Sequence, residues 1–166
     1  MSTRNQITPV QRLKNALNAQ SVQEQFRNAL ADSAPLFVAS LIDIYGSDRN
    51  LQECEPGAVI MEALKAATLR LPINKNLGFA YIVPYKNKGK AEPQMQIGYK
   101  GLIQLAMRTG EYRYLNADVV YEGELKSFDK LTGHMDLSGE PTSNKVIGYF
   151  AYLELLNGFT KAVYWT

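Results

Sequence analysis

The chain has 166 residues, 46% of them hydrophobic and 20% charged, and its formal net charge is +2. These values fit one globular domain with a substantial core and exclude a disordered or fibrous protein. Cys54 is the single cysteine, so no internal disulfide forms, and no apolar run approaches eighteen residues, so we expect no transmembrane helix. The first twenty residues lack the apolar core of a signal peptide, and we therefore expect a cytoplasmic protein with no membrane partner.

The first half of the sequence predicts helices. Thr8 and Pro9 are typical of a helix start, with Thr8 as the N-cap and Pro9 in the first turn. Apolar residues then recur at intervals of three and four, as on one face of a helix. We expect further helices from Ser21, from Ser33 to a stop at Gly46, and from Pro56 to Leu69, with a loop over 47–55 and a helix end imposed by Pro72.

The second half predicts mainly strands. A hairpin is expected from strands at 79–85 and 94–97 around the basic turn Lys86–Lys90, followed by a helix from Tyr99 to Thr109 that Gly110 closes. Asn157 and Gly158 predict a type I′ turn between two later strands. The predicted fold class is α+β, with N-terminal helices followed by an antiparallel sheet that contains an inserted helix. The other strands are expected at 112–122, 124–130, 135–137, 145–156 and 159–165.

Aromatic residues alternate along the first strand of this hairpin. Phe79, Tyr81, Val83 and Tyr85 share one side of it, because strand side chains repeat every two residues. Alternating aromatics in strands usually belong to the core, so we expect Phe79, Tyr81 and Val83 to be buried.

We expect two parts in the chain, an N-terminal helical arm over 1–33 and a core domain over 34–166. The chain stops at Tyr164-Trp165-Thr166, inside or just after a strand. A large aromatic at such a position normally packs against a later segment. We therefore expect the core domain to be truncated at its C-terminus.

Basic charge is concentrated in one segment. The segment from Leu71 to Tyr114 contains seven lysines and arginines and two glutamates, so its net charge is +5, whereas the net charge of the whole chain is +2. The rest of the chain therefore sums to −3. Such segregation predicts a polyanionic partner for this segment. The cations are Lys75, Lys86, Lys88, Lys90, Lys100, Arg108 and Arg113.

The helix after the hairpin carries part of this charge on one face. Lys100, Gln104 and Arg108 lie four residues apart, and a helix rotates about 100° per residue, so the three side chains share a face. Cations in line with amides suit a phosphodiester backbone. Tyr99, between Gly98 and Gly101, is a candidate for stacking on a base. The alternative interpretation is a solvated helix face beside a solvated turn, and asparagines such as Asn76 also serve turns for conformational reasons.

An enzyme is not expected. His134 is the single histidine, and Glu53 and Glu55 flank Cys54, which raises the pKa of the thiol and makes it a poor nucleophile. The sequence has no phosphate-binding GxxxxGK[ST] loop, so ATP hydrolysis is not expected. Three carboxylates considered as Mg²⁺ ligands lack a recognisable spacing, and we expect neither a metal nor another cofactor. These carboxylates are Glu122, Glu124 and Asp129.

Several motifs resemble the RecT family of phage and prophage single-strand annealing recombinases. They are the runs 71–85 (LPINKNLGFAYIVPY), 96–101 (QIGYKG) and 105–110 (LAMRTG), with the terminal segment 146–165. The resemblance covers residues 34–166, with the N-terminal arm less distinctive. It implies a β-β-β-α type annealing-protein core like that of the lambda Beta recombinase.

The same resemblance implies a function. Proteins of this family bind single-stranded DNA, assemble into rings or helical filaments, and anneal complementary strands through a duplex intermediate without ATP. They usually act beside a 5′→3′ exonuclease of the RecE type, in the bacterial host. The DNA backbone is expected in a basic groove, with the bases outward for pairing. The implied DNA-binding residues are Lys75, Asn76, Lys86, Lys88, Lys90, Gln96, Tyr99, Lys100, Gln104, Arg108 and Arg113.

Two other functions stay open at this point. An RNA-binding protein or RNA chaperone uses the same cations and aromatics. A structural phage assembly protein uses the aromatic strand for protein contacts instead.

Overall fold

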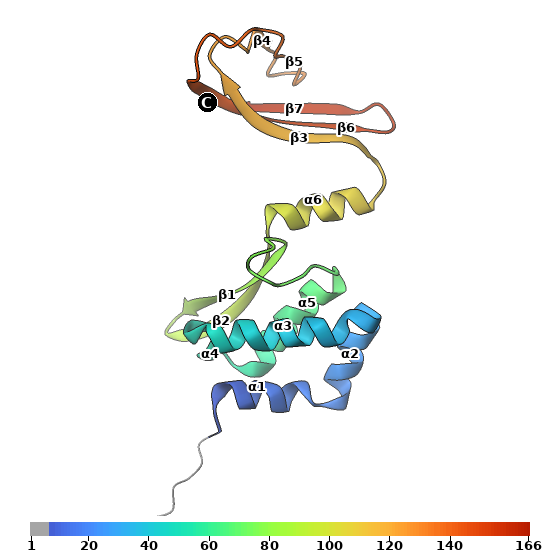
Figure 1. The fold of residues 1–166 in the computed structure, drawn as a ribbon, viewed down its shortest axis with the longest axis vertical. Coiled ribbons are helices and arrows are strands. Elements are labelled where there is room, and N and C mark those ends of the chain that lie inside the picture. Colours follow the sequence, from blue (N-terminus) through green and yellow to red (C-terminus); the bar gives the residue numbers. More distant parts are fainter. Residues whose placement is uncertain (1–6) are drawn as a thin grey trace, which may run out of the picture. The chain divides into compact units, whose positions relative to one another are not determined.

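The computed structural model describes residues 7–166, which form two compact units, 7–105 and 106–166 (Figure 1). The sequence placed a boundary at residue 33. In the structure, Leu13, Leu17 and Phe26 from that region are buried in the same core as Leu41 and Ile60. The helices on either side of residue 33 therefore share one core within the first unit.

The first unit contains, before its hairpin, five α-helices and one 3-10 helix in the described residues. They are α1 (Pro9–Leu17), α2 (Gln20–Leu30), the 3-10 helix η1 (Ala31–Ser33), α3 (Ala34–Ser47), α4 (Arg49–Gln52) and α5 (Pro56–Thr68). The predicted cap of α1 is confirmed, because the Thr8 hydroxyl oxygen accepts a hydrogen bond from the Gln11 N–H at 3.2 Å. Ser21 does not cap α2, which begins one residue earlier.

Three expectations about helix boundaries differ from the structure for local reasons. The region 47–55 contains α4, because the Asp48 carboxylate accepts hydrogen bonds from the N–H groups of Asn50 and Leu51. The end of α5 is set before Pro72. Arg70 has a φ of 51°, and the Leu71 N–H donates to the Ala66 carbonyl at 3.0 Å, as in a Schellman motif. The expected stop at Gly46 is also wrong, since α3 continues through Ser47.

The segment 20–47 is long and apolar enough to cross a membrane by length and composition alone. The expectation that no such run exists is therefore wrong. In the structure this segment is α2, η1 and α3, and its Phe26, Phe37 and Leu41 are core residues of the first unit.

The hairpin of β1 (Ala80–Asn87) and β2 (Lys90–Ile97) packs on these helices with the opposite face from the one expected. Ala80 and Ile82 are buried at 0% and 2% exposure, whereas Tyr81 and Val83 are only half-buried. The prediction that Tyr81 and Val83 are buried is wrong. Alternate side chains of a strand point to opposite faces, and the face of β1 that packs on the helices is the one that carries Ala80 and Ile82. Phe79, which precedes the strand, does pack against the core.

The turn of the hairpin is shorter than the expected Lys86–Lys90. The register runs from Ala80 opposite Ile97 to Asn87 opposite Lys90, so only Lys88 and Gly89 are left in the turn. Their φ angles of 48° and 81° are those of a type I′ turn. Glu62 of α5 fixes the second strand, because its carboxylate accepts a hydrogen bond from the Met95 N–H at 2.8 Å.

Helix α6 (Tyr99–Arg108) begins against the entrance to β1, and two glycines allow this contact. A Cβ atom on Gly98 would lie 2.3 Å from the Gly78 carbonyl oxygen, and one on Gly101 would lie 2.2 Å from the Phe79 carbonyl oxygen. The Gly98 N–H also donates to the Phe79 carbonyl at 2.9 Å. Glycine at these positions therefore serves contact within the chain.

The second unit is an antiparallel sheet of β3 (Tyr112–Tyr121), β6 (Val146–Leu155) and β7 (Thr160–Trp165), in the order β3-β6-β7, with a separate pair of β4 (Ser127–Phe128) and β5 (Met135–Asp136). The Phe128 ring lies 5.8 Å from the Tyr164 ring. The expected type I′ turn is wrong, because Gly158 has a positive φ of 87° but Asn157 does not. The α+β class is confirmed, and its strands form three antiparallel sheets in the described residues.

We predict that Gly101→Ala destabilises the first unit by about 1–3 kcal/mol, because the added methyl group meets backbone that cannot move aside cheaply. Urea unfolding monitored by circular dichroism measures the change. Gly57→Ala in α5 is the matched control, since a Cβ there meets no atom within 4 Å, and we expect equal or slightly higher stability. Equal stabilities of Gly101→Ala and the parent would contradict the close contact.

Candidate nucleic-acid interface

The exposed side of the β1–β2 hairpin, which we call the hairpin outer face, gathers aromatic, amide and basic side chains. The pairs across it are Tyr81 with Gln96, Val83 with Gln94, and Tyr85 with Glu92. Tyr85 is 44% exposed, and the β2 members of these pairs are all exposed. With a rise of about 3.3 Å per residue, this face is about 20 Å long. Its residues are Tyr81, Val83, Tyr85, Lys90, Glu92, Gln94 and Gln96.

The start of α6 joins this face at its base. The hydroxyl oxygen of Tyr81 and the aliphatic stem of Lys100 both lie 3.4 Å from the position that a Cβ on Gly78 would take. Tyr81 also lies 3.0 Å from the corresponding position on Gly98. Gln96 donates a hydrogen bond to the Tyr85 hydroxyl, which orients both side chains on the same face. Lys100 is therefore brought to the aromatic end of the hairpin outer face.

The lysines of the basic segment fall into two groups. Lys75 forms an ion pair with Asp48 at 2.9 Å, and Lys86 forms one with Glu53 at 3.6 Å, so both are held toward α4. Among residues 7–166, no ion pair involves Lys88, Lys90 or Lys100, and all three are exposed. The second group is the one that offers unneutralised positive charge to an anion.

The other predicted residues are more dispersed. Asn76 serves a turn, since its N–H donates to the Asn74 side chain at 3.0 Å. Tyr99 is 70% exposed beside Lys100, and Gln104 is exposed one turn further along α6. Arg108 lies at the end of α6 and is assigned to the second unit. Arg113 also belongs to the second unit, where it pairs with Glu154 at 2.8 Å.

Sequence reasoning missed two features of this region. Gln94 belongs to the hairpin outer face, and the exposed alternation of Glu92, Gln94 and Gln96 was the signal that identifies it. The carboxylates of Asp48 and Glu53 were not expected to neutralise basic-segment lysines, because both precede those lysines by more than 25 residues. Only the folded chain brings them together.

The residues considered for enzymatic chemistry are not arranged for it in the described part of the chain. Burial and the nearby Glu53 carboxylate raise the pKa of Cys54, which is 2% exposed. Within residues 7–166, no group of three or more histidine, cysteine or acidic side chains is placed to hold a metal ion. His134 is exposed in the turn between β4 and β5.

Comparison with known proteins identifies the family. The RecT family model matches residues 36–166, which include the hairpin, α6 and the sheet of the second unit. The chain belongs to the RecT family. This chain is 48% identical over 155 residues to "Uncharacterized protein YqaK" of Bacillus subtilis (strain 168), an alignment that covers 93% of this chain and 53% of that protein.

A second relative carries the family name. This chain is 37% identical over 83 residues to "Protein RecT" of Escherichia coli (strain K12), an alignment that covers 48% of this chain and 31% of that protein. The chain thus spans about half the length of YqaK and a smaller part of the second relative.

The ion pair between Asp48, at the start of α4, and Lys75, in the loop 71–78, can be tested through its dependence on pH. Its hydrogen bond with Lys75, with smaller contributions from Leu51 and Asn50, lowers the pKa of the Asp48 carboxyl below its ordinary value of 3.8. A lowered folded-state pKa means that the carboxylate stabilises the fold above pH 3.8 and that this stabilisation is lost as the pH falls through the lowered value.

We predict that Asp48→Asn, which keeps a good N-cap, lowers the free energy of unfolding at neutral pH by less than about 1 kcal/mol, because the ion pair is partly exposed. The difference from the parent shrinks toward zero as the pH falls through the lowered pKa of the Asp48 carboxyl. Urea titrations from neutral to acidic pH measure it. A difference that stays constant over this range would rule out the ion pair as its cause.

Proposed function

We propose that the chain is an ATP-independent single-stranded DNA-binding and strand-annealing protein of phage homologous recombination. The supporting observation is the hairpin outer face with Lys100 at its base. There, half-exposed tyrosines lie among amides and lysines that no carboxylate neutralises in the described residues. Family membership agrees with this function.

The chemistry of this face suits one extended strand. Lys88, Lys90 and Lys100 neutralise phosphates and release counterions, so binding weakens steeply with salt. Tyr81 and Tyr85 offer ring faces for stacking, which is tolerant of sequence. Gln94 and Gln96 donate and accept hydrogen bonds at the sugar and phosphate. With the backbone held in this way, a second strand approaches with less electrostatic repulsion, and base pairing supplies fidelity.

The proposed partners follow from the same function. Single-stranded DNA and the annealed duplex intermediate are the substrates, and a homo-oligomer, ring or filament, aligns many weak sites along one strand. A 5′→3′ exonuclease of the RecE type supplies the single strands. The proposed location is the cytoplasm of a bacterial host, with the protein encoded by a phage or prophage.

An annealing assay tests the function. Two complementary oligonucleotides with a fluorophore and a quencher are mixed with the protein without ATP, over a salt series. We expect faster quenching than without protein, with acceleration that falls as salt rises. No acceleration at any salt concentration would overturn annealing. Preferential binding of RNA over DNA of the same sequence would favour an RNA chaperone instead.

We predict that Lys88→Ala, Lys90→Ala and Lys100→Ala combined weaken single-stranded DNA binding about tenfold or more and reduce the slope of log affinity against log salt by about 2. Fluorescence anisotropy over a salt series measures both quantities. The control removes three exposed lysines of the second unit, Lys126, Lys130 and Lys161, so the net charge changes equally. Equal effects of the two triple variants would remove the hairpin from the binding site.

A further inference from the structure

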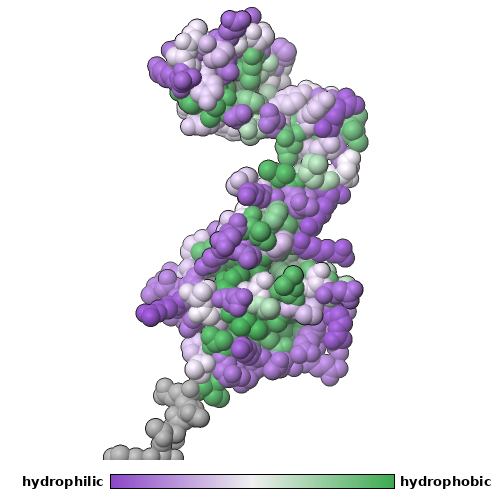
Figure 2. All heavy atoms as spheres, in the orientation of Figure 1, coloured by the Kyte–Doolittle hydropathy of each residue, from purple (hydrophilic) through white to green (hydrophobic). Residues whose placement is uncertain are grey.

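The hairpin outer face carries one carboxylate, that of Glu92, which lies directly opposite Tyr85. The side-chain amide of Asn87 donates a hydrogen bond to the Glu92 Oε2 atom at 3.4 Å. Glu92 is exposed, and among residues 7–166 no ion pair involves it, although Lys90 lies two residues away on the same side of β2. Figure 2 shows hydrophilic residues at the tip of the hairpin. A carboxylate accepts up to about four hydrogen bonds, so Glu92 keeps acceptor capacity for a ligand.

The ring of Tyr85 lies beside this carboxylate. The Tyr85 backbone is opposite Glu92, whereas the Tyr85 hydroxyl accepts a hydrogen bond from the side-chain amide of Gln96, four residues further along the same side of β2. The ring therefore extends along the face from Glu92 toward Gln96. A base stacked on this ring has one edge next to the Glu92 carboxylate, because side chains opposite each other in a strand pair are direct neighbours.

Glu92 differs from the other polar side chains of the face in the hydrogen bonds that it forms. The amides of Gln94 and Gln96 both donate and accept, and lysine only donates, whereas a carboxylate only accepts. On the base edge that faces the major groove, cytosine and adenine present an amino group, and thymine and guanine present a carbonyl oxygen in its place. A carboxylate accepts a hydrogen bond from the amino group and is repelled by the carbonyl oxygen.

We propose that Glu92 makes the hairpin outer face prefer cytosine or adenine over thymine or guanine at the nucleotide that stacks on Tyr85. The proposal rests on the proposed function and adds a specificity-determining residue to it. The contact uses the major-groove edge of the base, so the pairing edge stays free for the complementary strand. Because the same carboxylate repels phosphates, a strand without amino groups at this edge meets the repulsion without the hydrogen bond.

Two pyrimidine homopolymers test the preference. Labelled oligodeoxycytidylate and oligodeoxythymidylate of equal length are titrated with the protein at one salt concentration, and fluorescence anisotropy gives the affinities. We expect the parent to bind oligodeoxycytidylate about fivefold more tightly, as one charge-assisted hydrogen bond allows. An oligomer of 5-methyldeoxycytidylate, which carries the methyl group of thymine, is expected to bind like oligodeoxycytidylate.

Two substitutions of Glu92 separate hydrogen bonding from charge. Glu92→Gln removes the charge and adds a donor, so we expect oligodeoxythymidylate to bind about twofold more tightly and oligodeoxycytidylate about twofold more weakly, which brings the ratio close to one. Glu92→Asp keeps the carboxylate and is expected to keep the preference for oligodeoxycytidylate. Circular dichroism checks the fold of each variant.

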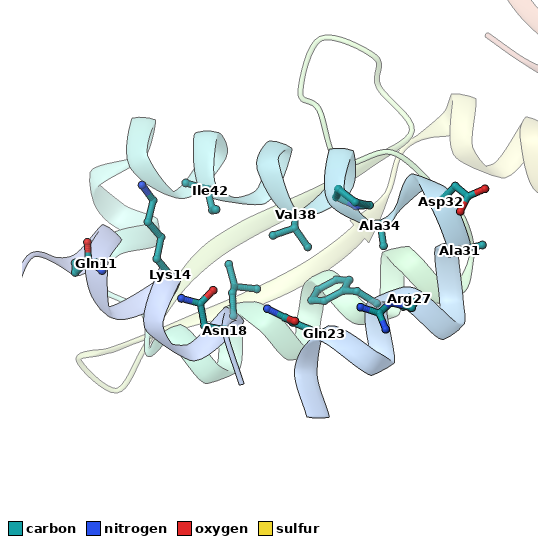
Figure 3. A pocket seen from close by; sticks show the side chains of 13 residues that line it. Gln11, Lys14, Asn18, Gln23, Arg27, Ala31, Asp32, Ala34, Val38 and Ile42 are labelled. Carbon is teal, nitrogen blue, oxygen red and sulfur yellow. The ribbon is translucent and has the colours of Figure 1, made fainter. Parts of the chain in front are cut away.

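Asp32→Asn is the control for net charge. Asp32 lines a groove of about 880 Å³ between α1, α2 and α3 (Figure 3), and no residue that lines this groove belongs to the hairpin. This substitution changes the net charge by the same amount as Glu92→Gln, so we expect the ratio of the two affinities to stay as in the parent.

Three results would overturn the proposal: equal affinities of the parent for the two homopolymers, a ratio in Glu92→Gln that equals that of the parent, or a loss of preference in Asp32→Asn as large as in Glu92→Gln. Each of them, with DNA still bound, leaves the proposed function standing. A parent that binds neither homopolymer would overturn the proposed function and this proposal with it.

Discussion

The contact between the start of α6 and the backbone at Gly78 and Phe79 is the constraint on which the candidate site depends. Two glycines, Gly98 and Gly101, let the helix approach carbonyl oxygens at distances that no side chain tolerates. The Gly98 N–H then closes a hydrogen bond to Phe79, and the Gly98 carbonyl accepts one from the Leu102 N–H at 3.0 Å. The residues that lead into β1 and the first turn of α6 are thereby held together as one rigid junction, which we call the corner.

This corner determines what lies on the hairpin outer face. It places the Tyr81 hydroxyl and the Lys100 stem on either side of Gly78, so a cation on a helix and an aromatic side chain on a strand become neighbours. The opposite side of the hairpin is held by the burial of Ala80 and Ile82 and by the Glu62 hydrogen bond to the Met95 N–H. The hairpin outer face is thus held in place by the packing of its opposite side on the helices, which suits a role in holding an extended ligand.

Much of the architecture was predictable because its signals are local. The Thr8 cap, the start of α5 at Pro56, and the strands at 112–121 and 146–155 follow from capping chemistry and β-branched or aromatic composition. The parity of β1 was not predictable in this way. Strand preference does not decide the parity, because Ile82 is as good a strand former as Tyr81 and Val83. The contact with the helices buries Ala80 and Ile82, and only packing reveals that choice.

The candidate site was predictable in part for a related reason. Charge segregation located the basic segment, and α-helical periodicity placed Lys100 and Gln104 on one face. The sequence did not separate the lysines that carboxylates neutralise from those without an ion pair among the described residues. Lys75 and Lys86 are neutralised by Asp48 and Glu53, which come from α4 and its flanks, and such pairs between distant segments leave no periodic signal.

Photo-crosslinking tests the central claim, that the hairpin outer face and the start of α6 hold the DNA strand. An oligodeoxynucleotide that carries 5-iodouracil is bound and irradiated, and the crosslinked peptides are identified by mass spectrometry. The expected peptides contain Tyr81, Tyr85 or Tyr99. Tyr114 and Tyr149 of the second unit are 59% and 57% exposed and report non-specific reaction. Crosslinks confined to Tyr114 and Tyr149 would contradict the claim.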